Sequence, residues 1–245
     1  MTTQKVFARN EIKYRIDRQM REELTAYMMP YMVPDAYGRS RILSLYYDTP
    51  DRLLARRSLE GPVYKEKIRL RSYGLARDDT TVFLELKKKY RQVTYKRRIG
   101  LSLRDAEDCL LGKRAVGTSQ IAREIDFTLK RYQNLLPACL ISAEREAFYA
   151  KDDHEFRITF DENLLADREH LSLREEARGI PLTEKGEVLL EIKTDAAIPL
   201  WLCRFLSERK LNKASFSKYG TAYLTFLSDD RKTEKQSYTD ERIFL

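Results

Sequence analysis

The amino-acid sequence predicts an α+β fold: an antiparallel β-barrel tunnel of about eight strands, with a charged interior and helices packed on the outside. Two observations carry this prediction. Charged and apolar residues alternate along most of the expected strands, so that each strand has one charged and one apolar face. Amphipathic helical segments accompany these strands and offer apolar surface to cover the apolar face. We expect one domain over residues 1–245, with its core at about 5–227 and a polar tail at 228–245.

The individual elements follow from periodicity and from turn and cap residues. Strands are expected at residues 5–16, 41–47, 64–73, 82–90, 92–99, 140–149, 156–160 and 187–194. Helices are expected at 18–29, directly after a turn at 48–51, and at 102–111, 119–135, 199–210 and 217–227. Asp17 and Ser102 are suited to cap their helices, and Pro199 to occupy a first helical position.

Composition narrows the class of function. The 46 Lys and Arg residues exceed the 38 Asp and Glu residues and give a formal charge of +8, which indicates an anionic partner. Three widely spaced cysteines and two histidines argue against a zinc centre or Ser-His-Asp catalysis. The sequence has no signal peptide and no apolar run of the roughly 18 residues that span a bilayer. We therefore expect a protein of the reduced cytoplasm.

The strand expected at 64–73 displays the charge pattern most clearly. Lys65, Lys67, Arg69 and Arg71 occupy alternate positions and would project to one side. The other expected strands add residues to the same charged face. Its cations are Lys13, Arg15, Lys65, Lys67, Arg69, Arg71, Lys87, Lys89, Lys96, Arg98, Arg145, Arg157 and Lys193, and its carboxylates are Glu11, Glu85, Asp161 and Glu191.

A single alternating strand is most often a sheet face with its charges in water. The same polarity recurs here in strand after strand, which favours a barrel with its apolar face outward and its charged face inward. An interior with so many cations requires an anionic ligand, because each unpaired buried ion costs several kcal/mol. A chain of phosphates meets this need, and carboxylates beside phosphates suit Mg²⁺ or Mn²⁺.

Short segments along nearly the whole chain, from about residue 5 to 227, resemble the VTC-type polyphosphate polymerase domain. That family belongs to the triphosphate tunnel metalloenzymes and is related to CYTH triphosphatases and class IV adenylyl cyclases. The segments are RNEIKY at 9–14, SLYYDTP at 44–50, KIRLR at 67–71, LELK at 84–87, KRR at 96–98, REAF at 145–148, RITFD at 157–161, LEIK at 190–193 and SFSKYG at 215–220.

The resemblance implies a tunnel enzyme that transfers the γ-phosphoryl group of ATP to a growing polyphosphate chain and releases ADP. The catalytic residues that it implies are Lys13, Arg69, Arg71, Lys87, Arg145, Lys193 and Lys218. The phosphate-binding residues expected around them are Arg15, Arg56, Lys67, Lys96, Arg98 and Arg157. The expected ligands of a divalent metal, Mn²⁺ or Mg²⁺, are Glu191, Glu11 and Glu85. Phosphoryl transfer depends mainly on positioning and charge neutralisation, so no dedicated nucleophile is required.

The sequence departs from the family pattern in three ways. Arg9 stands where the CYTH signature has its first Glu, and the missing carboxylate favours a polymerase over a hydrolase because it weakens a second metal site. Ala143 stands where the family often has Tyr, two residues before Arg145, so the sequence lacks the Tyr that the resemblance would place beside Arg145. We do not find the regulatory and membrane-spanning domains of eukaryotic versions. Attachment to the inner face of a membrane, if any, would need a separate protein partner.

Three functions remain open from the sequence. The favoured one is a polyphosphate polymerase acting on ATP and inorganic polyphosphate. The alternatives are a tunnel-type triphosphatase or polyphosphatase that hydrolyses nucleotide or inorganic triphosphate, and a non-catalytic polyphosphate or nucleotide sensor. Nucleic acid is not an expected partner, because the basic residues alternate inside the expected barrel and do not form a groove interleaved with stacking aromatics.

Overall fold

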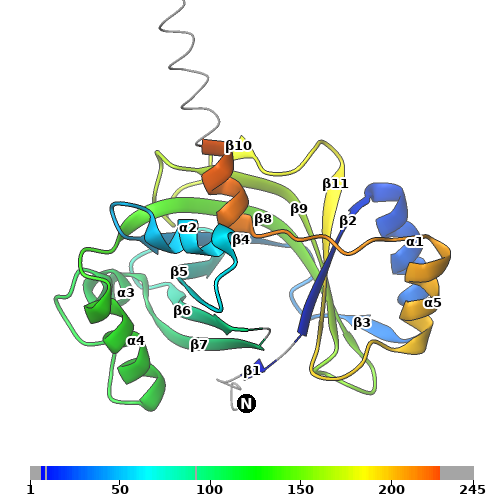
Figure 1. Cartoon of the computed structure of the whole chain (residues 1–245), viewed down its shortest axis with the longest axis horizontal. Coiled ribbons are helices and arrows are strands. Elements are labelled where there is room, and N and C mark those ends of the chain that lie inside the picture. The colour runs from blue at the N-terminus through cyan, green and yellow to red at the C-terminus, as the bar shows by residue number, and fades with distance from the viewer. Residues whose placement is uncertain (1–6, 9, 92, 227–245) are drawn as a thin grey trace, which may run out of the picture.

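The computed structural model describes residues 7, 8, 10–91 and 93–226, in which one antiparallel sheet is surrounded by helices (Figure 1). The strands are β1 (Phe7–Ala8), β2 (Asn10–Asp17), β3 (Met32–Pro34), β4 (Ser40–Asp48), β5 (Tyr64–Tyr73), β6 (Thr81–Tyr90), β7 (Val93–Ser102), β8 (Leu136–Ala150), β9 (Arg157–Asp167), β10 (Ile180–Pro181) and β11 (Glu187–Thr194). The helices are α1 (Arg18–Met28), α2 (Leu53–Glu60), α3 (Leu103–Leu110), α4 (Gln120–Arg131), α5 (Leu200–Glu208) and a last helix at 218–226. Each predicted strand and helix corresponds to one of these elements, and the short β3 and β10 were not predicted.

The sheet curls so far that its two edge strands are neighbours in the sequence. Its order is β1-β7-β6-β5-β4-β8-β9-β11-β2, with β3 added to β8 and β10 added to β9. β1 ends at Ala8 and β2 begins at Asn10, so the Cα atoms of these two residues are at most about 7.6 Å apart. No pairing between β1 and β2 closes the sheet among the described residues. The predicted barrel is therefore corrected to an open, curled sheet.

The division of the strand predicted at 5–16 explains why the sheet stays open. Its first described part, β1, pairs with β7, where Phe7 lies opposite Lys96. Its second part, β2, pairs with β11 at the other end of the sheet, where Asn10 lies opposite Thr194. The two parts therefore draw the ends of the sheet together without forming one continuous ladder. Residues 5, 6 and 9 of the predicted strand lie outside the described residues.

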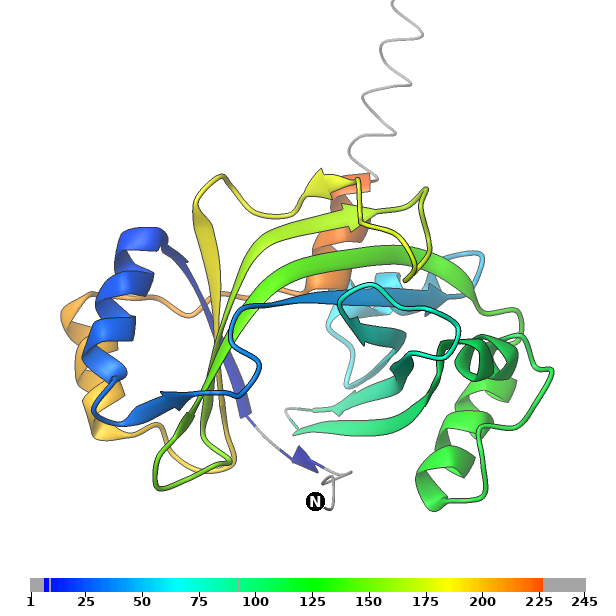
Figure 2. The ribbon, with the colours of Figure 1, turned by 180° about the vertical axis from the view of Figure 1, so that it is seen from behind.

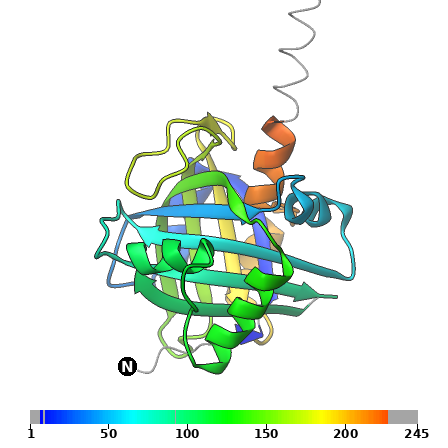
Figure 3. The same cartoon turned by 90° about the vertical axis from the view of Figure 1, so that its left-hand side faces the viewer.

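Two groups of helices cover the convex face of the sheet. α3 and α4 pack on β4 to β7, where Leu45, Leu70 and Leu84 are buried (Figure 3). α1 and α5 pack on β2, β9 and β11 at the opposite end of the molecule, where Ile158 and Leu190 are buried (Figure 1). These leucines and isoleucines belong to the apolar faces predicted from the alternation. The prediction that helices cover those faces is confirmed.

The last helix packs differently, because it lies against the concave face of the sheet. Its Tyr219 is buried in a cluster with Ile141 of β8. The preceding residue, Leu140, belongs to the cluster under α3 and α4, so Ile141 points to the concave side. Apolar residues at this end of the inner face need cover, and the last helix supplies it. The prediction that all helices lie outside the sheet is wrong for this one.

Asp48 joins the last helix to α2. Its fully buried carboxylate accepts hydrogen bonds from the backbone N–H groups of Leu54 and Ala55 at 2.8 and 2.9 Å, and from the hydroxyl of Tyr219 at 2.6 Å. Burial and the nearby Asp48 both raise the pKa of the Tyr219 hydroxyl, which therefore remains a donor. The turn predicted at 48–51 thus also fixes the position of the last helix.

Most of the predicted helix ends are confirmed. Asp17 accepts a hydrogen bond from the N–H of Met20, and Ser102 accepts one from that of Asp105. Pro199 occupies the N-cap of α5, one position before the predicted one, because its ψ of 143° is extended. None of the described helices combines the length and apolar character needed to cross a membrane.

The Asp48 anchor gives a prediction for stability. Asp48→Ala should lower the free energy of unfolding by about 3 kcal/mol, because hydrogen bonds to a charged group contribute roughly 1.5–3 kcal/mol and their buried donors would lose their partner. Asp17→Ala removes an exposed cap with a single bond and should cost only about 1 kcal/mol. Urea denaturation followed by circular dichroism measures both losses. Equal losses in the two variants would contradict the anchoring role of Asp48.

Candidate functional site

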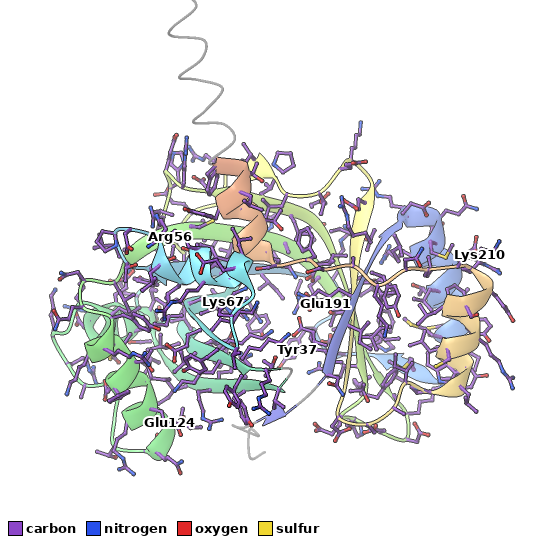
Figure 4. All side chains as sticks on the ribbon, in the orientation of Figure 1. Tyr37, Arg56, Lys67, Glu124, Glu191 and Lys210 are labelled. Carbon is purple, nitrogen blue, oxygen red and sulfur yellow. The ribbon has the colours of Figure 1, made fainter. Side chains whose placement is uncertain are left out.

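The charged side chains of the sheet gather on its concave face. On β5, Arg69 contacts Glu85 of β6, whereas the next residue, Leu70, is fully buried in the convex cluster. Figure 4 places Lys67 of β5 and Glu191 of β11 near the middle of the molecule, between the two walls of the curled sheet. The alternation predicted for β5 is therefore confirmed, and its cations face those of distant strands.

A first group of charges, the Glu85 cluster, surrounds one buried carboxylate. Oxygen atoms of Glu85 lie 2.8 Å from Arg69 Nη2, 2.6 Å from Lys96 Nζ, 3.5 Å from Arg98 Nε and 3.9 Å from Arg71 Nε. Burial alone would raise the pKa of Glu85, but Arg71, Arg69 and Lys96 outweigh it and hold the pKa well below its usual value. Burial lowers the pKa of Lys96 to about 7, against the opposing effect of Glu85. One carboxylate is therefore not enough to balance four cations.

A second group, the Glu191 cluster, surrounds two buried carboxylates on the opposite wall. Lys218 Nζ lies 2.7 Å from Glu191 and 2.6 Å from Asp161. Arg145 forms two hydrogen bonds to Asp161, at 2.5 and 2.6 Å, and Lys193 Nζ lies 3.0 Å from Glu191. Burial would raise the pKa of Glu191, but Lys218, Lys193 and other cations hold it well below its usual value. Burial lowers the pKa of Lys193 to about 8.

Glu11 of β2 connects the second wall to the first. Its carboxylate lies 2.8 Å from Lys87 Nζ of β6 and 3.1 Å from Lys13 Nζ. Burial would lower the pKa of Lys13, but Glu191 and Glu11 raise it to about 12. β2 is one edge strand of the sheet, and β6 lies two places from the other edge strand, β1. The ion pair between Lys87 and Glu11 therefore bridges the gap where the two ends of the sheet approach each other.

Lys67 occupies the region between the two clusters, and within the described part of the chain it forms no ion pair with a carboxylate. Its ammonium group donates to the hydroxyl of Ser217 at 2.8 Å. Burial and the neighbouring cations, first Lys87 and then Lys13, lower the pKa of Lys67 well below its usual value. The neighbouring cations, whose effect adds to that of burial, indicate that positive charge is in excess at this point.

The contacts together define a basic interior with ten cations and four carboxylates. Its cations are Lys13, Lys67, Arg69, Arg71, Lys87, Lys96, Arg98, Arg145, Lys193 and Lys218, and its carboxylates are Glu11, Glu85, Asp161 and Glu191. All seven predicted catalytic residues lie in this interior. A ligand with several negative charges would offset the excess, as a chain of phosphates does.

The carboxylates differ in how well they suit a metal ion. The described residues contain no group of three or more His, Cys, Asp and Glu side chains placed to hold a metal. Glu11 and Glu191 both contact Lys13, at 3.1 and 3.7 Å, so their hard oxygen atoms lie around one ammonium group. They fit a divalent ion whose remaining ligands are phosphate oxygens. Glu85 fits less well, because it lies in the other cluster and is enclosed by four cations.

Three predicted phosphate-binding residues lie outside the basic interior, and their side chains are 40% exposed or more. Each has an acidic partner of its own: Arg15 with Glu187, Arg56 with Asp51, and Arg157 with Asp35. Arg56 lies on α2, away from Glu191 in Figure 4. Arg157 lies opposite Lys193 in the sheet, so it stands at the edge of the basic interior and not within it. The phosphate-binding role of these three residues stays a prediction.

Four polar residues in or beside the basic interior were not predicted as site residues. Asp161 holds Arg145 and Lys218, although the alternation had placed it on the charged face. Tyr46 accepts a hydrogen bond from Arg69 at 2.8 Å, and Ser44 one from Arg71 at 3.4 Å. Ser217 binds Lys67. Ser44 and Tyr46 alternate with apolar residues on β4, and this alternation could have placed them on the concave face. They carry no charge, so the charge pattern of the strands did not include them.

Comparison with solved structures supports the fold. A candidate adenylate cyclase from Bacillus halodurans superposes with a TM-score of 0.57 at 12% identity, covering 87% of this chain and 96% of that one. A candidate adenylyl cyclase from Hippeastrum, which has a dominant triphosphatase activity, superposes with a TM-score of 0.51 at 15% identity, covering 89% of this chain and 96% of that one. At these identities the likeness shows the fold alone.

Sequence comparison shows the family. No curated protein matches the chain. The profile of the VTC domain matches residues 8–227, which include every residue of the basic interior. Because this match extends over most of the chain, the protein belongs to the VTC domain family.

Proposed function

We propose that the protein is a metal-dependent polyphosphate polymerase that transfers the γ-phosphoryl group of ATP to a polyphosphate chain held in the basic interior. The observation that carries this proposal is the excess of cations over carboxylates, divided between two walls that face each other. Membership of the VTC domain family supports it. We propose the cytoplasm as the site of this reaction, because ATP is available there.

In the proposed reaction a terminal phosphate oxygen of the polymer attacks the γ-phosphorus of ATP. A new P–O–P bond forms, the bond between the γ-phosphorus and the β–γ bridging oxygen breaks, and ADP leaves with that oxygen. The cations of the Glu85 and Glu191 clusters hold the two phosphate chains end to end. They also neutralise the charge that spreads over the transferred group, which is the main requirement of phosphoryl transfer.

The carboxylates have two proposed roles. Glu191 and Glu11 would hold a divalent ion together with substrate phosphates, and that ion would add charge neutralisation at the transferred group. Glu85 would instead keep Arg69, Arg71, Lys96 and Arg98 apart from one another and correctly oriented. We therefore propose Glu85 as a positioning residue and not as a metal ligand.

The second candidate function is hydrolysis of a nucleotide or inorganic triphosphate in the same basic interior, with water as the acceptor. This alternative is supported by the fold that the chain shares with the Hippeastrum protein, which has a dominant triphosphatase activity. Arg9, in place of the first Glu of the CYTH signature, favours the polymerase. A sensor that binds polyphosphate without turnover is the non-catalytic alternative.

A product assay separates these functions. Purified protein is incubated with ATP and Mn²⁺ while ADP, free phosphate and acid-stable polymer are measured together. We expect ADP and polymer in matching amounts. Free phosphate in amounts equal to ADP would contradict the polymerase and support the hydrolase. Tight polyphosphate binding without any product would contradict both enzymatic functions and support the sensor.

The metal role of Glu191 predicts that Glu191→Gln lowers metal-dependent turnover by roughly 100-fold or more, because it removes a charged ligand at the transferred group. Glu187→Gln is the matched control, since Glu187 lies on the same strand and pairs with the exposed Arg15. Initial rates are measured over a range of Mn²⁺ concentrations, and thermal unfolding verifies that both variants fold. Equal rates in Glu191→Gln and wild type would show that Glu191 is not a ligand of the metal.

The depressed lysine pKa values predict a pH-dependent stability. Lys96 and Lys193 have pKa values of about 7 and about 8 in the folded protein, below the usual lysine value of about 10.4 in an unfolded chain. Between pH 7 and 8.5 the unfolded chain therefore binds more protons, and the free energy of unfolding should rise with pH. Bound tripolyphosphate favours the charged ammonium groups and should reduce this rise.

Urea denaturation at pH 6.5, 7.5 and 8.5, with and without tripolyphosphate, measures this effect. Lys96→Gln removes one of the two titrating groups, so the rise without ligand should be smaller in this variant than in wild type. An identical rise in both proteins, unaffected by tripolyphosphate, would show that the basic interior is not its source.

A further inference from the structure

One end of the basic interior carries a group of aromatic side chains that the proposed phosphate chemistry does not use. Tyr73 ends β5, two residues after Arg71 on the same face, and Phe83 of β6 and Arg98 of β7 lie beside it. Tyr37, from the loop between β3 and β4, stacks on Tyr73. We call Tyr37, Tyr73 and Phe83 the aromatic platform.

The platform is open to solvent and yet held in place. The rings of Tyr37 and Tyr73 are nearly parallel, at 18°, with centroids 6.5 Å apart, and Phe83 meets Tyr73 edge-on at 5.9 Å. Tyr37 is 80% exposed and Tyr73 is 49% exposed. Packing in a core does not account for them.

Arg98 ties the platform to the Glu85 cluster. Its guanidinium lies 3.4 Å from the centroid of the Phe83 ring and donates to the hydroxyl of Tyr73 at 3.3 Å. Its Nε lies 3.5 Å from Glu85. The same side chain therefore belongs to the platform and to the basic interior. A ligand with an aromatic part and a phosphate part would contact both.

The loop that carries Tyr37 is fixed by its own backbone. Asp35 accepts a hydrogen bond from the N–H of Tyr37 at 3.0 Å through its side chain, and its own N–H donates to the carbonyl of Ala147 on β8 at 2.8 Å. Gly38 follows with a φ of 54°, a left-handed conformation that glycine adopts at little cost. These bonds place Tyr37 over Tyr73 at the beginning of β4.

The platform and the last helix occupy opposite ends of the basic interior. Tyr73 lies opposite Ile42 near the start of β4, whereas Tyr46, farther along β4, stacks on Tyr219 of the last helix at 4.7 Å. The loop between β3 and β4 faces the viewer in Figure 2, and the last helix faces the viewer in Figure 1. The last helix covers one end, and the platform marks the other.

We propose that the aromatic platform binds the purine base of a nucleoside triphosphate, and that the nucleotide enters the basic interior from this end. The inference rests on the proposed function, and it adds the site of the base and the direction of entry. Along β5, Arg71 and Arg69 lie about 7 and 13 Å from Tyr73, in line with it. A base stacked on Tyr73 directs its phosphates to these two arginines. The polyphosphate acceptor then lies toward Lys67 and the last helix.

Calorimetric titration compares two ligands that differ in the base: the β,γ-imido analogue of ATP and inorganic tripolyphosphate, both with Mg²⁺. Tyr37→Ala and Tyr73→Ala should each bind the ATP analogue roughly 5- to 100-fold more weakly, since they remove a stacking surface. Their affinity for tripolyphosphate should stay within about twofold of wild type, because the cations remain. Tyr73→Phe keeps the ring and should retain the affinity for the ATP analogue.

Tyr31→Ala is the matched control. Tyr31 is also a partly exposed tyrosine, 43% exposed and stacked on Trp201, but it lies beside α1 and α5. It should bind both ligands like wild type. Equal weakening of both ligands in the platform variants, or no weakening of either, would overturn the base site while the phosphate site remains. A wild-type protein that binds neither ligand would overturn the proposed function and this inference with it.

Discussion

The excess of positive charge on the concave face is the constraint on which the rest of the structure depends. Strand alternation puts Arg69 and Arg71 inward only because Leu70 between them is buried outward under α3 and α4. A shift of one residue in the strand pairing would turn the apolar side chains toward the concave side and the cations outward under the helices. The packing of the helices on the apolar face therefore keeps the cations on the concave face. Burial lowers the pKa values of Lys67, Lys96 and Lys193, and neighbouring cations lower them further through charge repulsion. A polyanion relieves it.

The last helix combines a structural and a chemical role in two adjacent residues. Tyr219 binds the buried Asp48, which also holds the start of α2, and Lys218 pairs with Asp161 and Glu191. The helix therefore covers apolar residues at one end of the concave face and brings a cation into the Glu191 cluster. The position of Lys218 depends on the same bond that fixes the helix.

The sequence predicted the elements and the charged face well, because both follow from local periodicity. Arg69, Glu85 and Lys193 were placed on one face by alternation alone, and their ion pairs confirm it. Closure of the sheet was predicted wrongly, because it depends on how the first strand divides between β7 and β11. The inward packing of the last helix was also missed, since an amphipathic helix does not reveal which face of a sheet it covers.

The division of the cations into two clusters could not be predicted from the sequence either. It depends on which carboxylate each cation reaches across the curled sheet, as with Lys87 and Glu11. Exposed arginines such as Arg56 have the same sequence signal as buried ones, so the alternation and the resemblance did not separate them from the basic interior. Uncharged partners such as Tyr46 carry no charge pattern at all.

The central claim is that a phosphate chain binds in the basic interior between the two clusters. A crystal structure of the protein with tripolyphosphate and Mn²⁺, using the anomalous signal of manganese, tests it most directly. We expect phosphate groups in contact with Arg69 and Arg71 on one wall and with Lys218 on the other, and manganese beside Glu191. Phosphate found only on the outer surface, with the ion pairs of both clusters unchanged, would contradict the claim.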